Sequence, residues 1–135
     1  MTPILKSIDH IHVYVVNRGI ATNWYHKVLG MKPITDLEFW ANDGGPLTIS
    51  DSSGSVHLAL FESKKEKCRS TIAFGVGAKE FLAWQIHLGE TFKQEVKAVD
   101  HAVAWSLYFT DPDGNPFEIT SYDHESLAKS LRTEA

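Results

Sequence analysis

The chain has 135 residues, of which 43% are hydrophobic and 22% are charged, as in an ordinary globular protein with room for one core. Its formal net charge of −4 argues against nucleic acid or an anionic membrane as a partner. No apolar run approaches the roughly 18 residues of a membrane-spanning helix. The single cysteine, Cys68, cannot form an internal disulfide, which fits a reducing cytoplasm. We therefore expect one cytoplasmic domain over residues 1–135, with no membrane and no nucleic-acid partner.

The first half of the chain predicts five elements in the order strand, helix, strand, strand, strand. Residues 8–16 alternate between two faces, one of them apolar, which is the period of a half-buried strand. Apolar residues four positions apart then predict a helix over 20–29, which ends at Gly30. The remaining three strands are predicted over 31–40, 47–50 and 56–61.

The second half predicts the same order after a charged linker over 62–69. The predicted elements are a strand over 71–76, a helix over 78–88 that ends at Gly89, a weakly marked strand near 92–96, and strands over 104–110 and 117–122. Asp, Pro and Gly in the segment 111–114 match a type I turn between the last two strands. A short helix is predicted at the end of the chain, about 124–132, with Asp123 as its N-cap.

The two halves match residue by residue when the sequence is shifted by 60 or 61 positions, so that segment 9–15 falls on 70–76. A repeat of this length is one supersecondary unit that cannot bury its apolar face alone, so two copies should share a core. The sequence therefore predicts an α+β fold built from two β-α-β-β-β units, about 7–61 and 70–122.

Polar residues that can bind a metal occupy matching positions in the two copies. His10 falls on Thr71 and His57 falls on Glu118, with the same spacing of 47 residues in each copy. We expect these positions to converge on whatever lies between the copies. Two neutral imidazoles and one carboxylate form a 2-His-1-carboxylate set, which suits Fe(II), Mn(II), Ni(II) or Zn(II) with open coordination positions.

Three motifs on this repeated frame resemble the vicinal oxygen chelate superfamily, which includes glyoxalase I, fosfomycin-resistance thiol transferases, extradiol dioxygenases and bleomycin-resistance proteins. They are IDHI (8–11), WYHKVLGM (24–31) and YFTDPDGNPFE (108–118). The resemblance covers nearly the whole chain. It implies a cup-shaped mixed sheet with the helices outside, and a homodimer.

The resemblance also implies a metal site. It assigns the ligands to His10, His57 and Glu118, and the expected cofactor is a divalent ion, Fe, Mn, Ni or Zn. Thr71 stands where glyoxalase I, the fosfomycin transferases and the extradiol dioxygenases normally have a further histidine, and its hydroxyl is a poor ligand for a transition metal. His12 shares the strand face of His10, so it could replace His57 as a ligand or act as a base beside the metal.

Residues around this ligand set are candidates for chemistry on a small-molecule substrate. Tyr108 and Tyr122 have the strand parity of Glu118, so their hydroxyls could orient a substrate. His101 lies in a loop and is a candidate general acid or base, the role that histidine fills most often in enzymes. The predicted catalytic residues are Glu118, His101 and Tyr108. The predicted substrate contacts are His12, Tyr108, Tyr122 and Trp105.

The sequence thus favours a glyoxalase-like or dioxygenase-like metalloenzyme that acts on a small oxygenated metabolite through bidentate chelation of the substrate by the metal. Isomerase, lyase and ring-cleaving dioxygenase chemistry all stay open. The alternative is a metal-free protein that binds and sequesters a small, antibiotic-like molecule, as bleomycin-resistance proteins do. The three ligand-type residues favour the enzyme, and Thr71 favours the binding protein.

Overall fold

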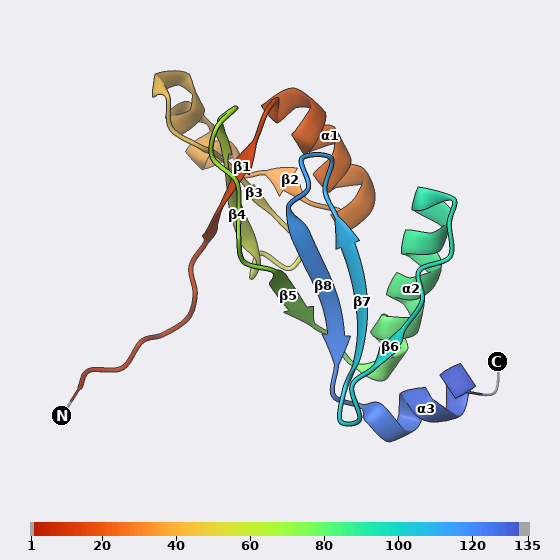
Figure 1. Cartoon of the computed structure of the whole chain (residues 1–135). Coiled ribbons are helices and arrows are strands. Elements are labelled where there is room, and N and C mark those ends of the chain that lie inside the picture. Colours follow the sequence, from red (N-terminus) through yellow and green to blue (C-terminus); the bar gives the residue numbers. More distant parts are fainter. Residues whose placement is uncertain (1, 133–135) are drawn as a thin grey trace. The chain divides into compact units, whose positions relative to one another are not determined.

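A computed structural model describes residues 2–132 of the chain. The contacts divide the chain into two compact units, with the boundary between Lys67 and Cys68, inside the predicted linker. Each unit contains one four-stranded mixed sheet and its own helices (Figure 1). The α+β class and the two β-α-β-β-β units are therefore confirmed.

Unit 1 has four strands, one α-helix and one 3-10 helix. In chain order they are β1 (Ile11–Val15), α1 (Arg18–Leu29), β2 (Lys32–Pro33), η1 (Thr35–Asp43), β3 (Leu47–Ser50) and β4 (His57–Glu62). The strand order is β1-β4-β3-β2, with β1 parallel to β4 and the other pairs antiparallel. As predicted, α1 ends at Gly30, which adopts the left-handed conformation with φ of 69°.

The core of unit 1 lies on the face of the sheet that α1 covers. Val13 and Val15 of β1 and Leu58 and Leu60 of β4 have no exposed surface. They alternate with more polar residues on β1, which confirms the predicted apolar face of the first strand. Apolar residues of α1 complete this core: Ala21, Tyr25, Val28 and Leu29.

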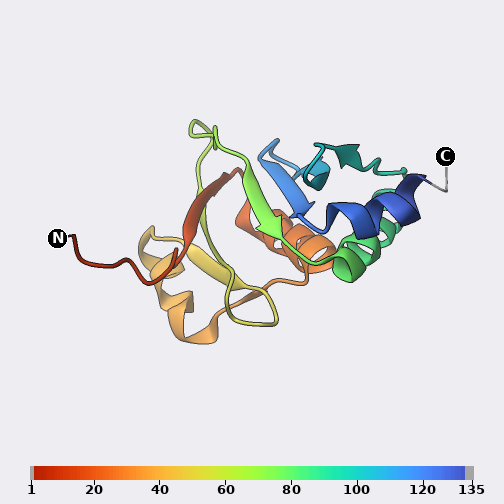
Figure 2. The same cartoon turned by 90° about the horizontal axis from the view of Figure 1, so that it is seen from below.

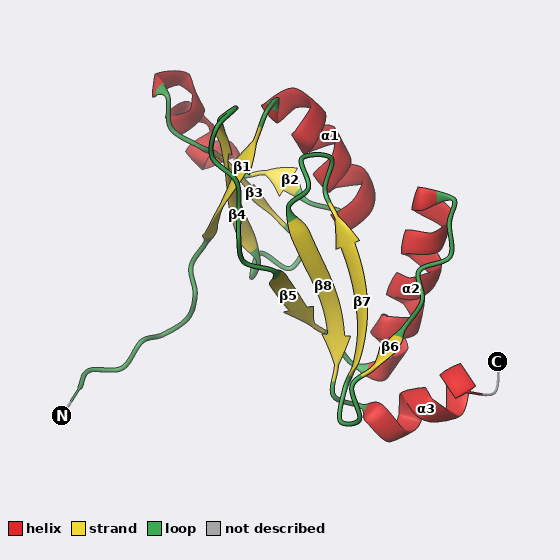
Figure 3. Cartoon of the chain, in the orientation of Figure 1, coloured by secondary structure: helices red, strands yellow, loops and turns green. Residues whose placement is uncertain are grey.

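The predicted strand over 31–40 is wrong for most of its length. Only Lys32 and Pro33 pair with β3, and a helical segment follows, η1, which is drawn red between β2 and β3 in Figure 3. Asp36 and Glu38 lie in its first turn, where negative charge stabilises a helix N-terminus. Gly44 ends it with φ of 80°. The acidic first turn and the terminal glycine are helix signals that the strand prediction did not take into account.

Unit 2 repeats the plan of unit 1 and adds a helix at the C-terminal end. Its elements are β5 (Ile72–Gly75), α2 (Ala78–Phe92), β6 (Val99–Asp100), β7 (Trp105–Thr110), β8 (Pro116–Ser121) and α3 (His124–Arg132). The strand order is β5-β8-β7-β6, with β5 parallel to β8 and the other pairs antiparallel. The two sheets therefore have the same topology.

The core of unit 2 contains a row of aromatic rings across its sheet. Phe117 lies between Phe74 and Phe109, with ring centroids 5.8 and 5.6 Å away and nearly parallel planes. Leu107 and Ile119 share this buried face, and Phe81 and Leu88 of α2 pack beneath it.

The longer helix of unit 2 runs past its predicted end. Gly89 does not stop α2, which continues to Phe92 and ends at Lys93 in the left-handed conformation, with φ of 54°. The ring of Phe92 packs 6.2 Å from that of Phe109, so tertiary packing favours the extra turn. The predicted strand near 92–96 is therefore wrong, and the edge strand is β6 instead. Within residues 2–132, no helix is both long and apolar enough to cross a membrane.

Asp123 begins α3 as predicted but also serves another helix. Its backbone oxygen accepts the first helical hydrogen bond of α3, from Leu127 N at 3.1 Å. Its carboxylate Oδ2 accepts a hydrogen bond from Ala78 N at 2.9 Å, at the start of α2, where the N-cap residue Gly77 has no side chain to do so. The contact brings the starts of α2 and α3 together, and the two helices lie side by side in Figure 2.

Candidate functional site

In unit 1 the face of the sheet opposite α1 carries the imidazoles. The parallel register pairs His12 with Ala59 and Tyr14 with Phe61, so these four residues share one face. The His12 ring rests against the Phe61 ring at 4.7 Å between centroids. The first strand thus presents its polar residues away from the core, as the alternation predicted.

His10 and His12 are in direct contact at the start of β1. The Nε2 atoms of the two imidazoles are 3.2 Å apart, and their rings stack with centroids 5.1 Å apart. Asp9 Oδ2 lies 2.8 Å from Nδ1 of His10. A carboxylate at Nδ1 holds the tautomer with its proton there, which leaves the Nε2 lone pair of His10 directed at His12.

His57 does not occupy the position equivalent to Glu118. The turn before β4 (51–56) is one residue longer than the turn before β8 (111–115), and β4 begins at His57 whereas β8 begins two residues before Glu118. The residue of unit 1 equivalent to Glu118 is therefore Ala59. The predicted match of His57 with Glu118 is wrong because a constant shift in sequence cannot follow turns of different length. His57 stays half-buried on the face of Ala59 and His12.

In unit 2 the equivalent face carries a carboxylate and hydroxyl groups. Glu118 pairs with Ala73 on one side and with Tyr108 on the other. The Oγ of Ser106 donates a hydrogen bond to Glu118 Oε2 at 2.7 Å. Ser106 is only 1% exposed, and the carboxylate it holds is half-buried. The Oγ1 of Thr120 lies 3.1 Å from the same serine hydroxyl.

Two further predicted catalytic residues lie beside Glu118. Tyr108 is its cross-strand partner, and the Tyr108 hydroxyl is 2.9 Å from Nε2 of His101. The backbone places His101 by a hydrogen bond from its N–H to Ala104 O and by a tight turn in which Ala102 has φ of 69°. Tyr108 is 46% exposed. The structure thus brings Glu118, Tyr108 and His101 together on one face of unit 2.

Trp105 lies on the opposite face of the same sheet. It is 6% exposed, its Nε1 donates to the backbone oxygen of His124 at 3.2 Å, and its ring stacks on the His124 imidazole. Packing beneath α3 therefore occupies Trp105, and the expectation that it lines the substrate site is wrong. The parity of β7 explains this, since Trp105 alternates with Ser106. Tyr122 follows β8 and is 78% exposed, without a role that the structure defines.

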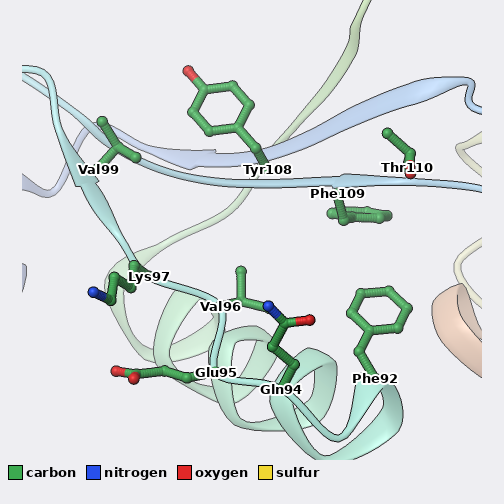
Figure 4. Close-up of a pocket in the computed structure, with 9 residues that line it drawn as sticks. All are labelled: Phe92, Gln94, Glu95, Val96, Lys97, Val99, Tyr108, Phe109 and Thr110. Carbon is green, nitrogen blue, oxygen red and sulfur yellow. The ribbon is translucent and has the colours of Figure 1, made fainter.

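Figure 4 separates the two faces of unit 2 around a cavity of about 440 Å³. Phe92 and Phe109 lie on the helix side of the strands, whereas the ring of Tyr108 points to the other side. The cavity is lined by the end of α2, the segments 94–97 and 108–110, and Val99 of β6. It is therefore separate from the face that carries Glu118.

Sequence reasoning missed two residues that position these groups. Ser106 holds Glu118, and Asp9 holds His10. Both have a local signal: Ser106 is a small polar residue two positions from Tyr108 on the same strand face, and Asp9 adjoins a histidine. Thr71 is exposed just before β5. Among the described residues, no group of three or more His, Cys, Asp or Glu side chains is arranged to hold a metal ion.

Solved structures with the same fold cover most of this chain. A protein assigned to the glyoxalase family from Bacillus anthracis is 22% identical with a TM-score of 0.70, over 90% of this chain and 99% of that one. An integron cassette protein from the mobile metagenome of the Halifax Harbour sewage outfall is 23% identical with a TM-score of 0.69, over 87% and 99%. The fosfomycin resistance protein FosX from Mesorhizobium loti is 16% identical with a TM-score of 0.61, over 87% and 93%.

The comparison with curated proteins found no match to this chain. A family model does match, over residues 7–119, and its description is Glyoxalase/Bleomycin resistance protein/Dioxygenase superfamily. The match begins before His10 and ends within β8, one residue after Glu118. The chain therefore belongs to the glyoxalase/bleomycin resistance protein/dioxygenase superfamily, also called the vicinal oxygen chelate superfamily.

Proposed function

We propose that this chain is a metal-dependent enzyme of its superfamily that acts on a small oxygenated molecule, with His10 and Glu118 among the metal ligands. The observation that carries the proposal is that a neighbouring side chain orients each of these two potential ligands. Asp9 holds the His10 imidazole in the tautomer that can bind a metal through Nε2, and Ser106 holds one oxygen of the Glu118 carboxylate. Both donors lie on the sheet face opposite the core of their unit.

The donor chemistry fits a divalent transition metal. Imidazole and carboxylate together suit Fe(II), Mn(II), Ni(II) and Zn(II). When bound, such an ion supplies a positive charge that polarises a substrate oxygen. Ser106 engages Oε2 of Glu118, which leaves Oε1 as the oxygen for a ligand. The Glu118 carboxylate is half-buried, and a bound cation would offset the cost of burying its charge.

Tyr108 and His101 form the proton-transfer part of the proposed site. The phenol oxygen lies within hydrogen-bond distance of the imidazole Nε2, so Tyr108 could pass its own proton to a neutral His101 as it accepts one from a substrate, and take it back afterwards. Tyr108 also adjoins Glu118 across the strand pair, so a substrate oxygen near the carboxylate lies within reach of the phenol. Tyr108 is therefore the proposed acid–base group, and His101 positions and recharges it.

The direct test is metal binding by the untagged protein. Elemental analysis after purification, followed by titration with Zn²⁺ or Ni²⁺, should show one ion per chain. We expect Glu118→Gln to lower the affinity at least about tenfold, since it removes a charged ligand and keeps the size of the side chain. Glu90→Gln is the matched control, because Glu90 is exposed on α2. Unchanged binding in the Glu118 variant would overturn the proposed ligand set.

One observation favours a second candidate, a metal-free protein that binds a small molecule. Thr71 replaces a donor, and residues 2–132 hold no arranged group of three donors. If the wild-type protein binds no divalent ion at micromolar concentration, this candidate takes precedence. Calorimetry with a cationic, antibiotic-like compound would then be the next measurement.

A further inference from the structure

The pattern His10-Ile11-His12 places two imidazoles on one side of an extended chain. Residues two apart on a strand are about 6.6 Å apart along it, close enough for two long side chains to lean toward each other. They do so here, and their Nε2 atoms come to 3.2 Å. The contact joins the two nitrogen atoms that histidine most often offers to metals.

This separation matches two ligands on one ion. With metal–nitrogen bonds of about 2.0–2.1 Å, two ligands at octahedral or tetrahedral angles are about 2.9–3.4 Å apart. The observed 3.2 Å lies within that range. An ion could therefore take the place of the proton between the rings with little movement of either ring, with His12 losing its Nε2 proton and adopting the tautomer protonated at Nδ1.

Neighbouring groups hold both rings in place. Asp9 fixes His10 at Nδ1, and Phe61 supports the ring of His12 at 4.7 Å between centroids. His57 lies on the neighbouring strand β4, two residues before Ala59, the partner of His12. The two imidazoles in mutual contact are therefore those of His10 and His12, and each has a neighbouring group against it.

The repeat gives His12 a second reason to be a ligand. In unit 1 the register pairs His12 with Ala59, and in unit 2 it pairs Ala73 with Glu118. Ala59 is the equivalent of Glu118, so the pair His12–Ala59 of unit 1 is equivalent to the pair Ala73–Glu118 of unit 2. Each pair contains one potential metal ligand and one alanine, and in unit 1 the potential ligand is His12. His10 lies one level away, just before the ladder begins.

We propose that His10 and His12 together chelate the divalent ion, so that His12 supplies the imidazole that Thr71 and His57 do not. Asp9 is the positioning residue of this pair. The inference deepens the proposed function and rests on it only for Glu118, the acidic ligand. In the proposed ligand set, the two neutral imidazoles then come from a His-x-His pair at the first strand, and the carboxylate comes from Glu118.

Calorimetric titration of the untagged, full-length protein with Zn²⁺ tests the chelate. We expect His12→Gln to lower the affinity at least about tenfold, comparable with His10→Gln. His57→Gln and His26→Gln should change it less than about twofold. His26 is the control for surface histidines, because it is exposed on α1. Circular dichroism of each variant checks that the fold is retained.

The outcomes separate this inference from the proposed function. If His57→Gln loses affinity and His12→Gln keeps it, the His12 chelate is overturned and the proposed metalloenzyme stands. If the wild-type protein binds no Zn²⁺ or Ni²⁺, both are overturned. If binding depends on both His10 and His12 but not on Glu118, the chelate stands and the proposed ligand set fails.

The positioning role of Asp9 has its own readout. Nitrogen chemical shifts of the His10 ring report which nitrogen carries the proton. We expect Asp9→Asn to shift the neutral ring toward the tautomer with its proton on Nε2 and to weaken Zn²⁺ binding, with Asp9→Glu restoring part of both. An unchanged tautomer in Asp9→Asn would remove Asp9 from the site.

Discussion

The two units share one topology but carry different residues of the proposed metal-ligand set. Unit 1 has imidazoles on its first strand and Ala59 where unit 2 has Glu118. Unit 2 has the carboxylate on its fourth strand and Thr71 where unit 1 has His10. These side chains also have different kinds of neighbour: Asp9 adjoins His10 in the sequence, whereas Ser106 contacts Glu118 across a strand pair. A duplicated frame can thus keep its fold while each copy keeps only one type of donor.

The largest expected effect separates two adjacent residues of β8. Phe117→Ala should lower the free energy of unfolding by about 3–5 kcal/mol, because it removes the middle ring of a buried stack. Glu118→Gln in metal-free protein should change it by less than about 1 kcal/mol, because the Ser106 hydrogen bond can persist to an amide oxygen. Urea denaturation with unchanged m-values measures both. A large loss in the Glu118 variant would make Glu118 a structural residue.

A second test gives unit 2 a histidine at the position that is equivalent to His12 of unit 1. Ala73 is exposed and pairs with Glu118, so Ala73→His places an imidazole beside the carboxylate, with Cβ atoms about 4.5–5.5 Å apart. We expect Zn²⁺ affinity to rise about tenfold, with stability unchanged to within about 0.5 kcal/mol. Lys79→His, at an exposed position in the first turn of α2, should leave binding unchanged. Equal affinities for the two variants would contradict the register of β5 on β8.

A third test uses α3, which unit 1 lacks. The hydrogen bonds from Arg132 and then His124 hold the pKa of Asp100 well below its usual value of 3.8. A depressed carboxyl pKa stabilises the fold above pH 3.8, and this stabilisation is lost as the pH falls below it. Asp100→Asn should therefore lower the Tm at pH 7 and flatten its decrease between pH 4 and 2. Asp43→Asn, at an exposed site on η1, should leave that acid decrease unchanged.

The smallest expected effect compares the two helix ends. α1 ends at Gly30 with φ of 69°, whereas α2 ends at Lys93 with φ of 54°. Gly30→Ala should destabilise the protein by about 1 kcal/mol, and Lys93→Gly should stabilise it by up to about 1 kcal/mol, since only glycine adopts this conformation without strain. Thermal melts of the two variants should therefore shift in opposite directions.

The sequence was sufficient for several elements that have a local signal. Alternation located β1, glycine located the end of α1, and the turn 111–114 located the hairpin of β7 and β8. The predicted strand over 31–40 was wrong because this segment contains both a two-residue strand, β2, and most of a short acidic helix, η1. Their combined composition does not show where the strand ends and the helix begins. The end of α2 depended on Phe109, seventeen residues from Phe92 in the chain, which no local pattern contains.

The candidate site follows the same division. His10, Glu118 and Tyr108 could be singled out from motifs, and strand parity placed Tyr108 beside Glu118. The contact between His101 and Tyr108 depends on a turn in which Ala102 has a positive φ. Alanine rarely adopts this conformation, so the turn has no signal in the sequence. The position of His57 depended on one extra turn residue, which repeat matching could not assign.

Asp123 accepts hydrogen bonds from the starts of both α2 and α3, and this has a practical consequence for truncation of the chain. A chain trimmed to Ser121 would lose the acceptor for Ala78 N and the cover of Trp105 in one step. Trimming would therefore loosen the start of α2, which lies 45 residues before Asp123 in the chain. Limited proteolysis after Tyr122 should then be visible as a change in tryptophan fluorescence, with Trp105 as an internal reporter of the C-terminal helix.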